Sequence, residues 1–428
     1  MQSLSDIRKN FKASTGFFDK IILALLFFIW GCLTQLNDIT LPYLYDFGLG
    51  FSEALALQFT FFASYLLMSY PAAKLIDKLG YKNGIYIGLL LSAFGSIYFY
   101  IITGSTYYQN YLIALFIIGS GVALLQIAGN GYVVLSSDTN RAASNLTFLQ
   151  IFNSVGRLGV LLVSTSLFFI ITGMTIDELY SLGVDEYLEV QTQHIRMPYL
   201  WMALLIFLTA VLIYFSKLPE IKTNSLPVLI DNGRKQITSV FAVKHTILGA
   251  IAIFAYVGAE VAIGSYLVQY VSLPNVGGRF FPEKEALKMI QYYWGSALVG
   301  RIIGGFILRD ISLRKVTTGF AIAAAIFALV SIITSGKIAI VTIIAIGFFN
   351  SILFPAIFTL AISGLGHFAE EGAGLLITSI AGGAVVPYII VAFAALFGLQ
   401  FSFIIIVFCY IYIAFYGVYG SQYKQKTL

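Results

Sequence analysis

Apolar residues occupy this chain in long blocks, and short polar stretches separate the blocks. A helix needs about 20 apolar residues to cross a bilayer, and block after block reaches that length. The pattern predicts twelve membrane spans, at residues 20–44, 54–74, 84–104, 109–136, 145–172, 199–217, 246–272, 287–308, 315–335, 338–364, 373–397 and 400–420. We therefore expect an all-α polytopic membrane protein.

Composition supports this interpretation, because the 428 residues are 59% hydrophobic and only 11% charged, with a mean hydropathy of +0.89. A soluble core does not require so much apolar sequence. The first apolar block follows basic residues that resemble the start of a signal peptide, namely Arg8, Lys9, Lys12 and Lys20. No small-residue cleavage site closes this block, so we expect it to be retained as the first span.

The positions of Lys and Arg predict the orientation. Twelve spans put both termini on one side, and most basic residues fall in loops on that side, such as Lys82, Arg141 and Arg234. The loops on the opposite side contain only Arg196, Arg279, Lys284, Lys288 and Lys337. Because cytoplasmic loops are enriched in Lys and Arg, we expect cytoplasmic termini.

The longest polar break inside the chain, at residues 217–244, follows the sixth span. It divides the sequence into an N-terminal six-helix half at 1–217, a cytoplasmic central loop at 218–244 and a C-terminal six-helix half at 245–428. Small and charged residues end the second span at 71–80, and they end the eighth span at 300–309. This layout suggests a major facilitator architecture, with the site at mid-membrane between the halves.

The loop predicted at 175–198, on the side opposite the termini, is acidic. Its acids are Asp177, Glu178, Asp185, Glu186 and Glu189. We interpret the loop as a solvated cap rather than a cation site, because a run of like charges favours solvent.

Several classes of function find no support. Cys32 and Cys409 lie inside separate apolar blocks, which does not indicate a disulfide or a metal site. The three histidines, His194, His245 and His367, lie in or beside loops, and no Ser/His/Asp, metal-ligand or phosphate-loop pattern is present. There is no basic aromatic cluster of the kind that binds nucleic acid. We expect no enzyme activity, no cofactor, no metal and no nucleic-acid partner.

The carboxylate of Asp38 lies inside an apolar run from Ile21 to Tyr45. An Asp at the centre of a membrane helix costs about 2.5–3.5 kcal/mol on insertion scales, so it normally faces a protein interior or a watery cavity. Gln35 is three residues away and shares its helix face. Such an acid can bind a proton on one side and release it on the other. Two alternatives remain, a position at the outer interface and a permanent pair with Arg157.

A set of polar side chains recurs inside the predicted spans. Besides Gln35, these candidate substrate ligands are Gln126, Asn130, Gln150, Asn153, Tyr256, Glu260 and Asn350. Amides both donate and accept hydrogen bonds, and aromatic rings cover apolar sugar faces, so the set suits a neutral ligand rich in hydroxyl groups. The alternative is that they join helices, at about 0.6–2 kcal/mol each.

The remaining charges in the spans have several interpretations. Glu260 is a candidate hydroxyl acceptor, a second cation-coupling group or a helix contact. Arg157 lies near the start of the fifth span, where its side chain could extend to the interface. Arg301 is expected near the cytoplasmic end of the eighth span, in a gate or in helix packing.

Three charged residues at the end of the second span, Lys74, Asp77 and Lys78, are candidates for a cytoplasmic gate. Opposite charges there would hold the halves together by pairing. A solvated loop is the alternative.

Six motifs in both halves resemble the fucose, galactose and gluconate permease branch of the major facilitators, and within it the bacterial glucose/galactose transporters. They are LNDITLP at 36–42, LQIAGN at 125–130, LQIFNSVG at 149–156, YVGAEVAIGS at 256–265, PAIF at 355–358 and GLQFSF at 398–403. The resemblance implies a sugar:cation symporter in which Asp38 is the coupling acid. Gln126, where fucose permeases carry an acid, and Glu260 both fit the glucose/galactose branch.

The chain departs from this pattern at two positions. Gly131 stands where the family usually has Pro, and Arg157 stands where a small or neutral residue is usual. A cation at 157 would act on Asp38 if the two side chains approach each other.

From these residues and the resemblance we expect a monomeric hexose symporter of the bacterial inner membrane, driven by protons and working by alternating access. Sodium coupling with L-fucose or another sugar is one alternative. A second is an exporter of lipophilic or siderophore-like compounds, which the 16% aromatic content would also fit. A third is a sugar receptor that does not transport.

Overall fold

The computed structural model describes residues 4–14, 16–43, 51–105, 107–174, 178, 181–224, 226–230, 237–278 and 283–423. The elements are helices, as the hydropathy pattern predicts. Among the described residues, nine helical segments are long and apolar enough to cross a membrane. Helices α3, α6 and α10 cover the other three predicted ranges, and their crossing of the membrane stays a prediction.

The N-terminal part begins with a short helix that precedes the first predicted span. The helices are α1 (Leu4–Ser14), α2 (Phe17–Tyr43), α3 (Phe51–Leu79), α4 (Tyr81–Ile102), α5 (Tyr108–Ser136), α6 (Ala142–Thr172) and α8 (Val184–Phe215). Ile7 of α1 is 2% exposed, and the ring of Phe11 meets that of Tyr132 on α5 edge to face. Helix α1 therefore packs on the bundle by its apolar face.

The C-terminal part contains interrupted helices. Its elements are α9 (Lys244–Val271), α10 (Glu283–Asp310), α11 (Leu313–Ile333), α12 (Gly336–Asn350), α13 (Leu353–Ile362), α14 (Ala369–Thr378), α15 (Gly382–Phe397), α16 (Leu399–Ser402), α17 (Ile404–Phe415) and the π-helical turn Tyr416–Gly420. Pro355 has no backbone N–H to donate, which fits the break between α12 and α13.

Helix α8 differs from its prediction. It begins at Val184, so residues 184–198 are helical where a loop was expected. Asp185 and Glu186 lie in its first turn, where negative charge stabilises the partial positive charge of a helix N-terminus. The acids Asp177, Glu178 and Glu189 were part of the same prediction: Asp177 lies outside the described residues, Glu178 precedes α8, and Glu189 is within it.

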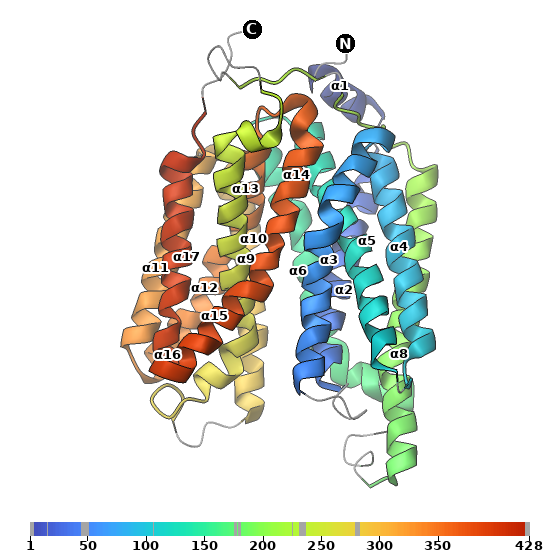
Figure 1. The fold of residues 1–428 in the computed structure, drawn as a ribbon, viewed down its shortest axis with the longest axis vertical. Helices are drawn as coiled ribbons and strands as arrows, with labels where there is room; N and C mark the ends of the chain where they lie inside the picture. The colour runs from blue at the N-terminus through green and yellow to red at the C-terminus, as the bar shows by residue number, and fades with distance from the viewer. Residues whose placement is uncertain are drawn as a thin grey trace.

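Two bundles stand side by side, with α2 to α8 in one and α9 to α17 in the other (Figure 1). Both termini lie at the same end, where α14 meets α3. The bundles contact each other along two lines: α14 packs against α3, and α6 packs against α10. The bundles diverge toward the opposite end (Figure 1).

Within each bundle, a glycine allows two helices to cross at close range, and the two pairs of helices correspond to each other. A Cβ on Gly156 of α6 would lie 2.4 Å from the carbonyl oxygen of Phe28, and one on Gly382 would lie 2.1 Å from that of Phe254. The first contact joins α2 to α6, and the second joins α9 to α15, which are the first and fifth predicted spans of each half. The two bundles therefore repeat one packing arrangement.

A second pair of contacts shows the same repeat. Gly119 of α5 faces Ser64 of α3, whose hydroxyl donates to the carbonyl oxygen of Phe61 at 2.6 Å. Gly347 of α12 faces Ser296 of α10, whose hydroxyl donates to the carbonyl oxygen of Tyr293 at 2.8 Å. The second and fourth helices of each bundle thus meet through a glycine and a serine.

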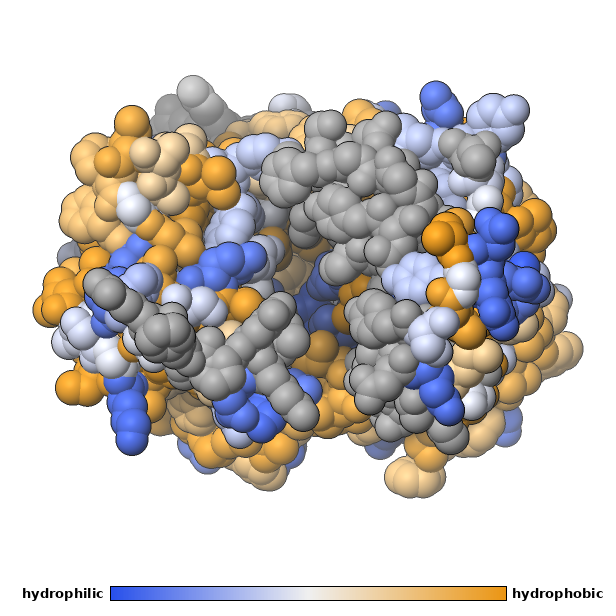
Figure 2. Space-filling view, turned by 90° about the horizontal axis from the view of Figure 1, so that it is seen from below, coloured by the Kyte–Doolittle hydropathy of each residue, from blue (hydrophilic) through white to orange (hydrophobic). Residues whose placement is uncertain are grey.

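A hollow lies between the bundles on the side away from the termini (Figure 2). Hydrophilic residues are visible in its depth, whereas hydrophobic residues dominate much of the outer rim. At the other end, a Cβ on Gly374 of α14 would lie 2.8 Å from the Cβ of Ala73 of α3. The molecule is therefore closed on the side of its termini and open on the other side.

Replacing Gly156 by Ala should lower thermal stability, because the added methyl group collides with the backbone of α2. Overpacking of this kind costs about 1–3 kcal/mol. Gly159→Ala, one turn further along α6, is a matched control, because nothing lies within 4 Å of its Cβ position. Thermal unfolding in detergent should give a lower Tm for Gly156→Ala than for Gly159→Ala. Equal Tm values would contradict the close crossing.

Candidate functional site

Asp38 lies on α2 with its side chain exposed, although Gln35 and Asn37 beside it are only 5% and 3% exposed. Arg157 of α6, Tyr65 of α3 and Tyr199 of α8 all lie within electrostatic range of its carboxylate. Because these groups come from three other helices, the carboxylate faces the interior of the bundle rather than its outer surface.

Arg157 lies in the same region and touches both bundles. Its Nε donates a hydrogen bond of 3.2 Å to the hydroxyl of Thr34 on α2. Its guanidinium carbon lies 4.7 Å from the ring centroid of Trp294, which belongs to α10 of the other bundle. In the described part of the chain Arg157 and Asp38 form no direct salt bridge, although they interact electrostatically. Thus Arg157 projects inward and does not extend to the interface.

Several amides of the N-terminal bundle have unused hydrogen-bonding capacity. Gln126 donates to the hydroxyl of Tyr65 at 3.0 Å, and Gln150 donates to Asn130 at 3.4 Å. Within the described residues, the following buried atoms have no hydrogen-bond partner: Gln35 Oε1, Asn37 Oδ1, Gln126 Oε1 and Asn130 Nδ2. An unpaired buried polar group costs about 1–3 kcal/mol, so these atoms are suited to a ligand that offers hydroxyl groups.

Glu260 of α9 forms a second acidic centre in the other bundle, and this one is buried. The Tyr256 hydroxyl donates to Glu260 Oε1 at 2.7 Å, and Glu260 is 9% exposed. Arg301 lies within electrostatic range of both residues. The structure thus puts a carboxylate and an arginine together in each bundle.

Arg301 also joins the bundles. Its Nη1 donates to the carbonyl oxygen of Gln150 at 3.3 Å and to the hydroxyl of Ser154, both on α6. Its Nε donates to the carbonyl oxygen of Ser351 at 3.2 Å, in the break between α12 and α13. With a side chain only 5% exposed, Arg301 lies inside the line of contact between α6 and α10.

Two of the candidate ligands, Asn350 and Asn153, are bonded to other helices of their own bundle. Asn350 donates to the Tyr293 hydroxyl at 2.9 Å and accepts from the Tyr410 hydroxyl at 2.7 Å. Asn153 donates to the carbonyl oxygen of Phe27 at 3.4 Å. Both contacts join helices within one bundle, which is the alternative role that the sequence left open.

The charges at the end of α3 face α14 across the closed end of the molecule. They line a cavity of about 390 Å³, and its lining includes Lys74, Asp77, Lys78, His367, Glu370 and Glu371. The ammonium of Lys74 lies 4.7 Å from the ring centroid of Tyr70 and within electrostatic range of Glu371. Charges from both bundles therefore meet where the bundles are in contact.

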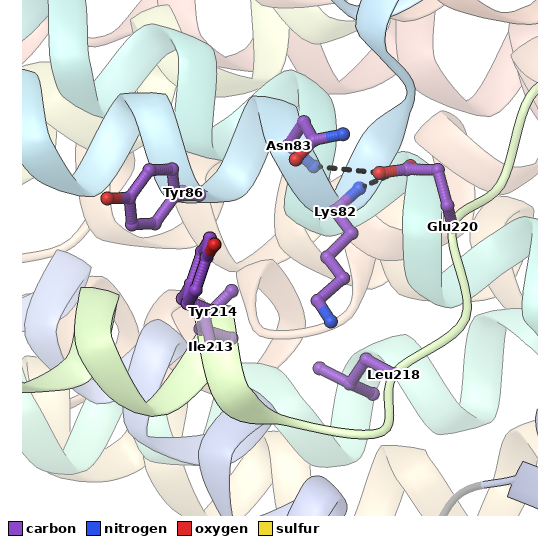
Figure 3. A pocket seen from close by; sticks show the side chains of 7 residues that line it. All are labelled: Lys82, Asn83, Tyr86, Ile213, Tyr214, Leu218 and Glu220. Carbon is purple, nitrogen blue, oxygen red and sulfur yellow. Dashed lines mark hydrogen bonds between the residues drawn. The ribbon is translucent and has the colours of Figure 1, made fainter.

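A second cavity, of about 310 Å³, lies between the start of α4 and the end of α8 (Figure 3). Glu220 accepts hydrogen bonds there from the backbone N–H groups of Lys82 at 2.8 Å and Asn83 at 3.1 Å. Burial raises the pKa of Glu220, and these hydrogen bonds oppose the rise. The carboxylate caps α4 and ties the segment after α8 to it, which is a structural role.

Sequence reasoning missed Thr34 and Tyr65 as members of the site, and it assigned no specific role to Trp294. Trp294 belongs to an aromatic run, Gln291 to Trp294, at the start of the eighth span, but aromatic residues are common throughout the chain. Thr34 lies one helical turn before Asp38 on the same face, a spacing that could have identified it. Tyr65 had no comparable signal.

Comparisons with known proteins agree with the motif resemblance. A family model described as Major Facilitator Superfamily matches residues 21–387. A glucose/galactose transporter of Brucella abortus is 39% identical, and the match covers 94% of this chain and 93% of the relative. A putative glucose/galactose transporter of Helicobacter pylori is 36% identical over 94% and 96% of the two chains. An L-fucose-proton symporter of Escherichia coli is 28% identical over 85% and 84%.

Solved structures show the same fold. The transporter FucP in its outward conformation superposes with a TM-score of 0.82 at 26% identity, covering 94% of this chain and 98% of FucP. The proton:xylose symporter XylE gives a TM-score of 0.71 at 15% identity, covering 93% and 94%. The second match supports the fold alone.

Asn350→Leu should destabilise the protein, because it leaves the hydroxyls of Tyr293 and Tyr410 without this partner inside the bundle. The expected loss is about 1–3 kcal/mol, measured as a lower Tm in detergent. Tyr410→Phe removes a single hydroxyl and should have the smaller effect. If Asn350→Leu leaves the Tm unchanged, the contact does not support the bundle.

Proposed function

The chain belongs to the major facilitator superfamily, and on that premise we propose that it is a sugar:cation symporter for a hexose such as glucose or galactose, coupled to protons. One observation carries the proposal: an accessible carboxylate, Asp38, inside a membrane bundle and close to amides with unpaired buried atoms. The named functions of the relatives at 39% and 36% identity support the same substrate class.

The sugar binds among the amides on α2, α5 and α6. Oxygens of Gln35 and Gln126 accept hydrogen bonds from sugar hydroxyls, and the Asn130 Nδ2 donates to a sugar oxygen. Gln150 is positioned by its bond to Asn130, and Glu260 with Tyr256 completes the site from α9. Asn153 and Asn350 support this set by joining helices.

Asp38 is the coupling group. A proton enters from the open side, neutralises the carboxylate and reduces the cost of enclosing it when the bundles close over the sugar. Glu260 is the second cation-coupling candidate, and it already accepts a hydrogen bond from Tyr256 and lies near Arg301. Asp38 is exposed whereas Glu260 is only 9% exposed, which favours Asp38 as the acid that exchanges a proton with the open side.

Alternating access follows from the two lines of contact between the bundles. With cytoplasmic termini, as the basic loops indicate, the hollow opens to the outside and the contacts of α3 with α14 form the inner gate. Lys74, Asp77 and Lys78 contribute charges to this gate, and Arg301 holds α6 against α10. Opening inward requires both sets of contacts to separate. The protein would thus lie in the bacterial inner membrane and act as a monomer.

Uptake by vesicles tests the function directly. Labelled glucose and galactose should accumulate in vesicles that contain the protein when the outside is acidic, and L-fucose should accumulate less. A sodium gradient at constant pH should drive little uptake. Accumulation only with sodium would reassign the cation, and a failure to accumulate any sugar would favour export or receptor function.

Asp38→Asn should abolish accumulation driven by a proton gradient while sugar exchange across the membrane continues. The amide keeps the size of the side chain and its ability to accept a hydrogen bond but does not carry a proton through the cycle. Asp138→Asn is the control, since Asp138 is a surface acid bonded to Lys12 at 3.1 Å. Normal accumulation by Asp38→Asn would show that another group couples transport.

A further inference from the structure

Arg157 has a set of contacts that the proposed cycle does not use. Its guanidinium lies between a hydroxyl of one bundle and an indole ring of the other, namely Thr34 and Trp294. Only its Nε has a protein acceptor among the described residues. The terminal nitrogens of this arginine are therefore available to an anion or a ligand within the site.

Charged and titratable groups surround Arg157 from several helices. Asp38 of α2, Tyr65 of α3, and Tyr293 and Arg301 of α10 interact with it electrostatically. A further hydroxyl, that of Tyr199 on α8, lies within range of Asp38. Glu260 is bonded to Tyr256 and lies near Arg301. Asp38 is therefore the carboxylate placed to attract Arg157.

The path of the Arg157 guanidinium from its present position beside Thr34 to the carboxylate of Asp38 is short. Thr34 and Asp38 are four residues apart on α2, so they lie on one helix face with their Cβ atoms about 5–6 Å apart. A guanidinium already bonded to Thr34 reaches the Asp38 carboxylate by moving along that face by about one helical turn. A change of side-chain conformation is enough for this movement.

The charge of Asp38 decides which partner Arg157 prefers. Opposite charges in contact attract each other more strongly than an aromatic ring attracts a cation. The carboxylate of ionised Asp38 therefore outcompetes Trp294, and the ring prevails once a proton has neutralised Asp38.

On the basis of the proposed function, we propose that Arg157 is a positioning residue that moves between Trp294 and the Asp38 carboxylate. With Asp38 ionised, the pair Asp38 and Arg157 lies wholly within the N-terminal bundle and occupies space beside the sugar site. Protonation of Asp38 releases the guanidinium to Trp294 and adds a contact between the bundles. Proton binding thus favours closure of the bundles over the sugar.

The pH dependence of transport tests this role. In Arg157→Gln, Asp38 loses a neighbouring cation and holds its proton to higher pH, so the curve of sugar uptake against external pH should shift upward by about one pH unit. Exchange of sugar should continue, which shows that the variant folds. Arg157→Lys keeps the charge and should restore the original curve. Arg196→Gln is the control, because Arg196 also lies over a ring, that of Tyr100, but outside the site.

Fluorescence of Trp294 reports the movement without any transport. The chain has three tryptophans, so Trp30→Phe with Trp201→Phe leaves Trp294 alone. Its emission maximum should shift between acidic and alkaline pH as the guanidinium leaves the ring. Adding Asp38→Asn should fix the emission at its acidic value. Adding Arg157→Gln should remove the pH dependence and give a different emission.

The results separate this proposal from the proposed function. If the parent protein fails to accumulate sugar, the symport function is wrong, whereas the fluorescence still shows whether Arg157 moves. If Arg157→Gln keeps the original pH curve, or if the emission of Trp294 ignores both Asp38→Asn and Arg157→Gln, Arg157 does not switch. Symport would stand in either of those cases.

Discussion

A charge inside a bilayer must find a partner within the protein, because hydrocarbon offers none. The two bundles meet this requirement in parallel. Asp38 has Arg157 within electrostatic range, and Glu260 has Tyr256 and Arg301. Both arginines also contact the opposite bundle. The arginines that lie near the two intramembrane acids therefore also connect the halves, so a change in the charge of either acid acts on the contact between the bundles.

Close helix crossings hold this arrangement together within each bundle. Gly156 and Gly382 bring equivalent helices to backbone contact in the two bundles, and Gly119 and Gly347 do the same for a second pair. Backbone approach of this kind is the usual substitute for a hydrophobic driving force between membrane helices. The bundles contact each other through α3 with α14 and through α6 with α10.

Much of the fold follows from hydropathy, because the bilayer fixes the length of a span and forces its backbone to bond to itself. Each predicted range falls on one or more helices in the described residues, and the range 338–364 is interrupted between α12 and α13. The start of α8 was not predicted, since residues 184–198 are polar and their helix is stabilised by the rest of α8 and by a buried face that includes Gln191 and Ile195. Hydropathy has no signal for a helix that continues beyond the membrane.

The sequence by itself determined which polar groups are costly enough to matter, because any amide or carboxylate in an apolar run stands out against its neighbours. It therefore supplied Asp38, Glu260 and the amides, and its motifs supplied the family. Only the tertiary structure decided which of these groups are already bonded within the protein, as Asn350 is, and which keep unused atoms, as Gln126 does. It also decided that Arg157 points to Trp294, a residue more than a hundred positions away on the other bundle. Helix periodicity relates residues on one helix, whereas partners on different helices are set by how the bundles pack.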